Sequence, residues 1–325
     1  MVTKQKKDRI VFLDAGSVDW GDLSLSELAR LGDLTVYPQT ESSKIEARSR
    51  GAQIIVTNKC RLTAKILSSL KHLKLICVAA TGINNIDLDA ARHLRIAVTN
   101  VPGYSTETVV QFTFSFLLSL ACNLRNYDEA AHDGRWSQSR FFTLPSFPVR
   151  EISGKVLGIV GYGKIGRRVA QAAKIFGMKV LVAQIPGRRY SAKEKKGRVS
   201  WGNFLRQSDF VTLHAPLTPL TQNLIDAKAL GKMKKKSFLI NMARGGLVNE
   251  KALDDALRSG HLAGAAADVL SEEPPPKNHL LLKVPNFILT PHVAWASREA
   301  RARLVYEMAL NIKAFRQGKR RNRAA

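Results

Sequence analysis

Short apolar runs alternate with segments of helical periodicity along most of the chain. Runs such as 9–14 (RIVFLD) and 52–57 (AQIIVT) have the length and composition of buried strands. Strands that alternate with helices predict a parallel sheet covered on both faces. In the first third of the chain the predicted strands are 9–14, 34–37, 52–57, 73–80 and 96–100, and the predicted helices are 22–31, 42–50 and 64–70.

A glycine-rich turn follows the apolar run 156–160, and helical periodicity resumes over 167–176. In this turn Gly161 permits a tight bend, Gly163 lets the backbone approach a pyrophosphate, and Gly166 lets helix and strand pack closely. The helix N-terminus offers free N–H groups and the positive end of its dipole to phosphates. Three glycines alone more often form an ordinary turn, but strand, turn and helix in this order predict a dinucleotide site.

The same alternation continues to the C-terminus. The further predicted strands are 179–183, 209–214, 237–242, 263–269 and 286–290, and the predicted helices are 201–206, 226–233, 249–259 and 296–316. We therefore expect an α/β protein with two Rossmann-like, doubly wound parallel-sheet domains. The NAD(P)-binding domain is expected at 106–294, inserted in a discontinuous substrate domain that consists of 1–105 and a returning helix in 295–325.

A long helix is predicted over 105–133, and it is apolar through 109–122. The segment 134–150 that follows has many aromatic residues and little periodicity, which is typical of a loop or an arm. We expect the helix and Trp136 to contribute to a homodimer, because a second copy would cover both apolar surfaces. The alternative is an internal core helix with a loop folded on its own domain.

The composition is that of a soluble globular protein, with 45% hydrophobic and 24% charged residues. No signal peptide is expected, and the apolar segment 109–122 is too short to span a bilayer, so no membrane association is predicted. The three widely spaced cysteines, Cys60, Cys77 and Cys122, suggest reduced thiols in a cytoplasm and no metal site.

The formal net charge is +25, which invites a nucleic-acid hypothesis. The basic residues are dispersed, however, with small clusters at 193–196, 232–236 and 319–323 and no nucleic-acid-binding motif beside them. Solvated faces explain such clusters, and a positive field would also attract anionic substrates and cofactors. We therefore predict no specific nucleic-acid partner.

Four polar side chains fall at predicted strand ends after the glycine turn: Arg244, Asp268, Glu273 and His292. Each alone has an ordinary explanation, such as a surface arginine or a core histidine. Their segments, with others, resemble the D-isomer-specific 2-hydroxyacid dehydrogenase family, most closely its glycerate dehydrogenase (hydroxypyruvate reductase) branch. The motifs that carry the resemblance are VAATGINNIDLDAA, GYGKIG, LHAPLTPLTQNLI, LINMARGGLVNEKAL, GAAADVLSEEP and LTPHVAW.

The resemblance implies that His292 is the catalytic acid/base, Glu273 its partner, and Arg244 the anchor of the substrate carboxylate. The chemistry requires these residue types. A guanidinium fork binds the carboxylate and carbonyl of a 2-oxo acid, and an imidazolium can protonate the alkoxide that hydride transfer leaves. The implied reaction is reversible reduction of a small 2-oxo acid, hydroxypyruvate or glyoxylate, to the D-2-hydroxy acid.

The resemblance and the strand-end rule together give the remaining site residues. Substrate-binding residues are Lys59, Thr81 and Gly82, beside Arg244 and His292. Cofactor-binding residues are Thr108, Gly161, Gly163, Lys164, Ile165, Gly166, Gln184, Arg188, Arg189, Ala215, Pro216, Ala243 and Asp268.

Gln184 stands where many family members carry an acidic residue that binds the ribose of NAD and repels a 2′-phosphate. Arg188 and Arg189 follow, and their guanidinium groups could bind that phosphate. The expected cofactor is thus NADP or NAD, with NADPH used at least as well as NADH. The alternative is that both arginines face solvent and the pocket is neutral.

Two rival functions share the family resemblance. One is a nucleotide-sensing corepressor, which would not require Arg244, Glu273 and His292 together. The other is a phosphoglycerate dehydrogenase, ranked lower because no regulatory domain follows Arg323.

Overall fold

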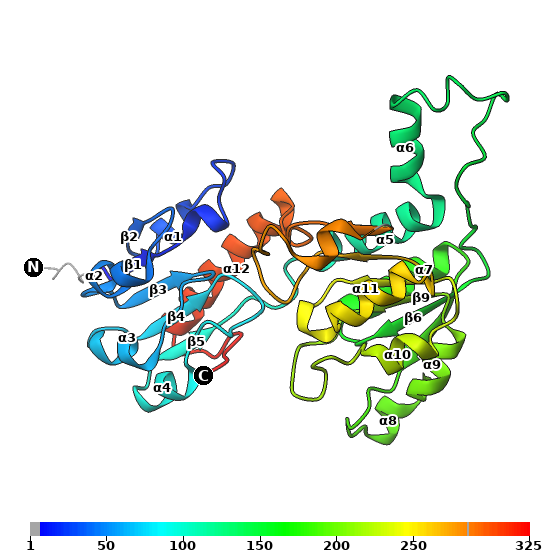
Figure 1. Cartoon of the computed structure of the whole chain (residues 1–325). Coiled ribbons are helices and arrows are strands. Elements are labelled where there is room, and N and C mark those ends of the chain that lie inside the picture. Colours follow the sequence, from blue (N-terminus) through cyan, green and yellow to red (C-terminus); the bar gives the residue numbers. More distant parts are fainter. Residues whose placement is uncertain (1–6, 285) are drawn as a thin grey trace, which may run out of the picture. The chain divides into compact units, whose positions relative to one another are not determined.

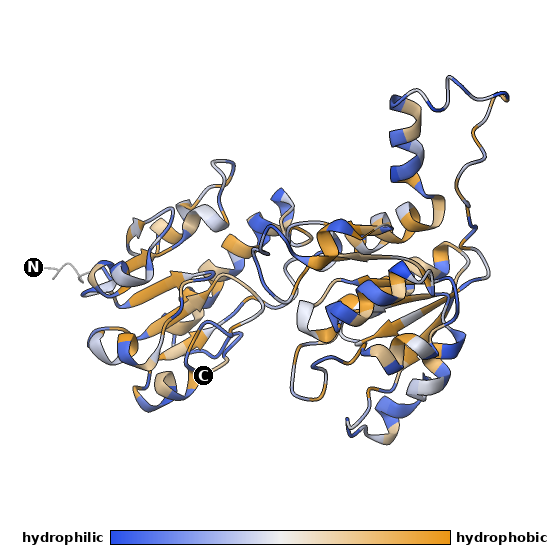
Figure 2. Cartoon of the chain, in the orientation of Figure 1, coloured by the Kyte–Doolittle hydropathy of each residue, from blue (hydrophilic) through white to orange (hydrophobic). Residues whose placement is uncertain are grey.

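The computed structural model describes residues 7–284 and 286–325. The chain divides into two compact units, unit 1 (Met1–Ser105 with Trp295–Ala325) and unit 2 (Thr106–Ala294). Each unit contains one parallel sheet with helices around it, which confirms the predicted fold class (Figure 1). In Figure 2 the strands of both sheets are predominantly apolar, and the polar residues gather on helices and loops.

Unit 1 has a five-stranded sheet in the order β2-β1-β3-β4-β5. Its strands are β1 (Arg9–Phe12), β2 (Asp33–Val36), β3 (Ile54–Thr57), β4 (Leu75–Val78) and β5 (Ala97–Thr99). Its helices are α1 (Ser26–Ala29), α2 (Ile45–Ser49), α3 (Ala64–Ser69), α4 (Leu88–His93) and α12 (Arg298–Arg316), with short 3-10 turns η1 (Ala15–Ser17) and η2 (Ser42–Lys44). Strands β3 and β4 are buried along their whole length, as continuous apolar runs require.

The returning helix α12 joins the core of unit 1 through Leu304 and Met308, which pack with side chains of the central strands. Its buried Arg301 donates two hydrogen bonds of 2.7 Å to the carboxylate of Asp22 and stacks on Trp20, 4.0 Å from the ring centroid. The guanidinium lowers the pKa of Asp22 to about 2. Arg301 thus connects α12, near the C-terminus, with the segment that precedes α1.

Unit 2 has a seven-stranded sheet in the order β12-β11-β10-β9-β6-β7-β8. Its strands are β6 (Val156–Val160), β7 (Lys179–Ala183), β8 (Arg198–Val199), β9 (Phe210–Leu213), β10 (Ser237–Asn241), β11 (Leu262–Ala267) and β12 (Phe287–Leu289). Its helices are α5 (Thr106–Cys122), α6 (Leu124–His132), α7 (Lys164–Ile175), α8 (Ala192–Lys195), α9 (Trp201–Gln207), α10 (Ala227–Lys232) and α11 (Glu250–Arg258), with 3-10 turns η3 (Gly245–Leu247) and η4 (Leu280–Lys283). The strand order reverses at β6, and ligands bind at such a switch point in open α/β sheets.

The predicted helix over 105–133 is wrong in one respect, because the chain breaks it into α5 and α6. Asn123 lies between them with a φ of 52°, a left-handed conformation that asparagine tolerates better than most residues. The two helices meet at an angle of 63°. Helix α6 and the segment after it extend away from the sheet of unit 2 (Figure 1).

The apolar face of α5 is buried inside unit 2, where Phe114, Leu117 and Leu120 pack with side chains of β6 and α7. The apolar surface that the sequence suggested for this helix is therefore mostly covered by its own unit. Among the described residues no single helix is long and apolar enough to cross a membrane, and α5 with α6 reaches the required length only as a bent pair.

Candidate active site

The glycine turn between β6 and α7 has the geometry of a dinucleotide cradle. Gly161 has a φ of +91°, and a Cβ there would lie 2.5 Å from the backbone nitrogen of Ala215. A Cβ on Gly166 would lie 2.1 Å from the carbonyl oxygen of Gly161, so neither glycine can carry a side chain. At Gly163, in contrast, a Cβ would meet no atom within 4 Å. The N-terminus of α7 thus faces open space in which a pyrophosphate fits.

This open space belongs to a cavity of about 590 Å³. Five of the predicted cofactor residues line it: Gly161, Gly163, Arg188, Ala215 and Pro216. Sequence reasoning missed other lining residues, most of them charged or polar: Tyr162, Arg167, Val182, Lys193, Glu194, Lys196, Gly197, Arg198 and His214. Position alone could have indicated Arg167, because it directly follows the third glycine in the first turn of α7.

The other predicted cofactor residues lie outside this lining: Thr108, Lys164, Ile165, Gly166, Gln184, Arg189, Ala243 and Asp268. Gln184 follows β7, and its amide nitrogen donates a long hydrogen bond of 3.5 Å to the carbonyl oxygen of Arg198. Both arginines are exposed, but only Arg188 lines the cavity, and it stacks on Tyr190 at 5.0 Å. Of the two arginines, only Arg188 is thus placed to contact a group in the cavity.

Cationic side chains surround the outer part of the cavity. Arg198 stacks between Tyr190 and Tyr162, at 4.9 and 5.9 Å from their ring centroids, and Arg167 lies 5.2 Å from the ring of Tyr162. Glu194 is the carboxylate among them, and Arg188 lies 3.5 Å from it. The cavity therefore carries an excess of positive charge, which favours a phosphorylated ligand.

His214 lies at the end of β9 beside the cavity. Its Nε2 is 3.0 Å from the hydroxyl of Thr212, while its Nδ1 is buried without a partner in the described structure. Burial lowers the pKa of the imidazole to about 3, because the charged form would lose its hydration. His214 is therefore neutral at physiological pH and contributes no charge to a bound phosphate.

His292 and Glu273 form a close pair at the opposite part of the same sheet edge. The Nδ1 atom of His292 is 2.6 Å from an oxygen of Glu273, and the two side chains are 27% and 35% exposed. The second oxygen of Glu273 accepts a hydrogen bond from the backbone nitrogen of Leu270. His292 has a φ of 54°, in the left-handed region, and such strain occurs where the surrounding structure imposes it.

Asp268 supplies part of that constraint. It is buried after β11, and one of its oxygens accepts hydrogen bonds from the Thr290 hydroxyl (2.5 Å) and the Val293 backbone (2.8 Å). Its other oxygen accepts from the backbone nitrogen of Ala294. Burial raises the pKa of the Asp268 carboxyl, although these hydrogen bonds oppose the shift. The structure thus shows Asp268 holding the segment that presents His292.

Arg244 follows β10 and is exposed, and its guanidinium donates a hydrogen bond of 2.7 Å to the adjacent carbonyl oxygen of Ala243. The side chain of Asn241 donates to the carbonyl oxygen of Arg244, which fixes the turn. Strands β10, β11 and β12 are neighbours, so Arg244, Glu273 and His292 all follow the carboxyl ends of adjacent parallel strands. This is the edge at which open α/β sheets bind ligands.

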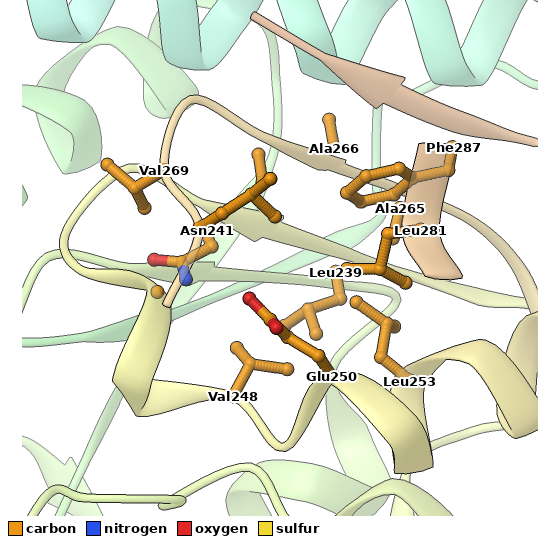
Figure 3. A pocket seen from close by; sticks show the side chains of 13 residues that line it. Leu239, Asn241, Val248, Glu250, Leu253, Ala265, Ala266, Val269, Leu281 and Phe287 are labelled. Atoms are coloured by element: carbon orange, nitrogen blue, oxygen red, sulfur yellow. The ribbon is translucent and has the colours of Figure 1, made fainter. Parts of the chain in front are cut away.

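A second carboxylate–imidazole pair, Glu250 and His279, stabilises the loop that carries Glu273. One oxygen of Glu250 accepts from the Ser271 backbone (2.8 Å), and the other lies 3.1 Å from Nε2 of His279. Figure 3 shows Glu250 among the apolar side chains Val248 and Leu253. The cavity drawn there measures about 10 Å³, so it has no room for a ligand and belongs to the packing of this loop.

The predicted substrate residues of unit 1 follow β3 and β4, which are neighbours in its sheet. The buried carboxylate of Asp14 accepts hydrogen bonds from three consecutive backbone nitrogens, those of Asn58, Lys59 and Cys60. Lys59 itself is exposed on this fixed loop. The hydroxyl of Thr81 donates to the carbonyl oxygen of Val101, which leaves Gly82 at the next position of the loop after β4. Sequence reasoning missed Asp14, because its partners lie more than 40 residues away.

Within the described residues there is no group of three or more His, Cys, Asp or Glu side chains that could hold a metal ion.

Comparison with known proteins gives consistent matches along the chain. The family model described as "D-isomer specific 2-hydroxyacid dehydrogenase, NAD binding domain" matches residues 114–294. A glycerate dehydrogenase of Methylorubrum extorquens is 39% identical, and the alignment covers 97% of this chain and 98% of that protein.

Two solved structures are similar over nearly their whole length. D-lactate dehydrogenase from Aquifex aeolicus, complexed with NAD and lactic acid, has a TM-score of 0.79 and 31% identity, covering 95% of this chain and 96% of that one. An acyclic imino acid reductase in complex with NADPH and D-Arg has a TM-score of 0.85 and 27% identity, covering 98% of this chain and 100% of that one.

Proposed function

The chain belongs to the D-isomer-specific 2-hydroxyacid dehydrogenase family, and we propose that its preferred reaction is reduction of hydroxypyruvate or glyoxylate to the D-2-hydroxy acid. The observation that carries this proposal is the 2.6 Å contact between His292 and Glu273 at the carboxyl edge of unit 2. The match to a glycerate dehydrogenase supports hydroxypyruvate as the substrate.

Each residue of the trio has a role that its geometry supports. His292 donates a proton to the carbonyl oxygen as hydride reaches the carbonyl carbon, and takes it back in the reverse direction. Glu273 fixes the tautomer and the orientation of the imidazole through its contact with Nδ1. Arg244 anchors the planar carboxylate through its guanidinium fork.

A nicotinamide dinucleotide supplies the hydride when it is bound. Its pyrophosphate would be held by the glycine turn and the N-terminus of α7, in the open space at Gly163. In this assignment unit 2 is the nucleotide-binding domain, and unit 1, with Lys59, Thr81 and Gly82, is the substrate domain. Asp268 positions His292 through the backbone and hydroxyl contacts of its carboxylate.

For the cofactor we propose that NADPH is used at least as well as NADH. Gln184 places no negative charge at the end of β7, and the cavity beside it is lined by Arg167, Arg188 and Arg198. Among the two arginines expected from sequence, Arg188 is the better placed, because Arg189 lies outside the lining. A neighbouring structure with NADPH is compatible with this choice.

Turnover of a substrate panel with both cofactors tests the function directly. We expect reduction of hydroxypyruvate and glyoxylate, and His292→Ala should lower kcat by about two to four orders of magnitude, as loss of a positioned acid does.

Two arginine variants test the cofactor proposal. Arg188→Ala should raise the KM for NADPH. Arg189→Ala is the control, since Arg189 lies outside the cavity and its loss should leave the KM values for both cofactors unchanged. Near-wild-type turnover by His292→Ala would refute the assignment of the acid, and a strong NADH preference would refute the cofactor proposal alone.

We also propose a homodimer in the cytoplasm. Large apolar side chains are exposed on the segment after α6, with Trp136, Phe141 and Phe142 at 52%, 66% and 93%. A second copy covering them would remove an unfavourable apolar surface from water. The cytoplasmic location is supported by three free cysteines, of which Cys60 and Cys77 are buried thiols.

A further inference from the structure

The sheet of unit 2 has a second cavity at its opposite edge, where the strands begin. We call it the amino-edge cavity, and it measures about 390 Å³. Its floor includes the stacked rings of Phe210 and Phe238, whose centroids are 4.8 Å apart. Five cationic side chains surround it: Arg150, Lys155, Lys234, Lys235 and Lys236.

The charges in this cavity are unbalanced, because its lining holds only two carboxylates, Glu151 and Asp209. Asp209 neutralises only Lys234: its carboxylate accepts hydrogen bonds from the Val156 backbone and from the ammonium of Lys234, both at 2.8 Å. Glu151 is exposed at the rim.

Of the remaining four cations, Arg150 is partly engaged within the protein, whereas the three lysines are available to a ligand. The guanidinium of Arg150 donates to the carbonyl oxygen of Lys236 (2.7 Å) and stacks over Phe238. Throughout residues 7–284 and 286–325, the ammonium groups of Lys155, Lys235 and Lys236 take part in no hydrogen bond or ion pair.

The backbone of Lys236 is strained. Its φ is 62°, a left-handed conformation that favours glycine, and the Lys236 nitrogen donates a hydrogen bond of 2.6 Å to the carbonyl oxygen of His261, just before β11. A long cationic side chain is therefore present where the backbone alone would select against one.

Helix electrostatics do not explain these lysines. Basic residues stabilise the last turn of a helix, and Lys232 has that place in α10. Lys235 and Lys236 lie beyond the helix end, after Met233, and this effect falls off within the last turn.

We propose that the amino-edge cavity binds a compact polyphosphate, that is, two or three linked phosphates that are either free or carried by a nucleotide. Phosphate oxygens accept charge-assisted hydrogen bonds from ammonium and guanidinium groups, and several linked phosphates are needed to engage several cations. The volume lies within the range of small-molecule sites. This site is distinct from the cofactor cavity, which lies at the opposite edge of the same sheet.

The probe is inorganic tripolyphosphate, titrated calorimetrically into the full chain at about 0.15 M salt with reduced cofactor in excess, so that the cofactor cavity is filled. We expect one binding event per chain, and Lys235→Gln should weaken it about tenfold, the effect of losing one charge-assisted hydrogen bond. Lys319→Gln removes an equal charge from the C-terminal basic cluster of unit 1 and should leave the affinity unchanged.

Lys236→Gly separates binding from stability. Glycine relieves the left-handed backbone, so Tm should stay equal or rise, while the affinity for tripolyphosphate should fall about tenfold. If the role of Lys236 were only structural, Lys236→Gly would not lower the affinity for tripolyphosphate while it keeps or raises Tm.

Titration with ATP under the same conditions identifies the form of the ligand, because equal affinity indicates free polyphosphate and tighter binding indicates a nucleotide. The proposal is overturned if wild type gives no binding, if both cavity variants bind as wild type does, or if Lys319→Gln weakens binding as much as Lys235→Gln. It is also overturned if a single-stranded oligonucleotide binds tightly and all three variants weaken it equally, since that would reveal only the general field of a basic protein.

Discussion

At the scale of single residues, the proposed role of Arg244 depends on the shape of its side chain as well as on its charge. Its guanidinium is planar and forked, whereas an ammonium is a point charge. We expect Arg244→Lys to raise the KM for the 2-oxo acid about ten- to a hundredfold, because the bidentate contact with the carboxylate is lost. Steady-state kinetics on hydroxypyruvate measure this. If KM and kcat are both unchanged, Arg244 is not the anchor.

His214 gives the protein a pH dependence of stability. In the unfolded chain this histidine titrates near its ordinary value of 6.5, whereas burial holds its folded-state pKa at about 3. Below pH 6.5 the unfolded chain therefore binds a proton that the folded protein does not, and stability is lost as the pH falls from 6.5 towards 3. Above pH 6.5 this contribution is fully present.

We expect the urea midpoint of wild type to fall between pH 7 and pH 5 by more than that of His214→Gln, which has no proton to take up. The difference in unfolding free energy should approach about 1.4 kcal/mol per pH unit inside that window. Parallel pH curves for the two proteins would show that His214 is hydrated or paired in solution.

At the scale of elements, the turn between β6 and α7 depends on contacts that admit no side chain. Gly166→Ala would place a Cβ 2.1 Å from the backbone oxygen of Gly161, and backbone cannot move aside as a flexible side chain can. We expect a loss of about 1–3 kcal/mol in the free energy of unfolding, the usual cost of overpacking. Chemical denaturation followed by circular dichroism measures it.

Two other glycines provide matched controls. Gly231 lies in α10 with open space around its Cβ position, so Gly231→Ala should stabilise the protein by about 0.5–1 kcal/mol. Gly163→Ala meets no atom of the protein either, so it should keep stability and weaken cofactor binding. Equal losses for all three variants would contradict the steric argument.

The elements also show what a sequence pattern can and cannot predict. Apolar runs and helical periodicity located the strands of both sheets except the two-residue β8, because burial on two faces leaves a continuous apolar signal. The break at Asn123 was not predicted, since it depends on one backbone dihedral inside an apolar stretch. The family resemblance implied the His292–Glu273 pair, whereas the cavity residue Arg198 and Asp14, which holds the loop after β3, depend on distant contacts that no local pattern records.

At the scale of the whole molecule, the exposed aromatic side chains of the segment after α6 should determine the oligomeric state. We expect a dimer in sedimentation velocity at micromolar concentration, and the double variant Phe141→Ser with Phe142→Ser should shift it towards monomer, because its apolar contacts are lost. Tyr306→Ser, at an exposed position on α12 in unit 1, is the control. A wild-type monomer under these conditions would refute the dimer.

Strand β12 has a consequence for how activity fails. It is three residues long, lies at the end of the sheet and pairs with β11, yet His292 follows three residues after its last residue. The cofactor cavity, in contrast, is built around β6 and β9, which have partners on both sides. Local opening costs least at such a sheet margin. We therefore expect mild stress to displace His292, the proposed proton donor, before it disrupts the glycine turn, so that the protein passes through a state that retains cofactor without turning it over.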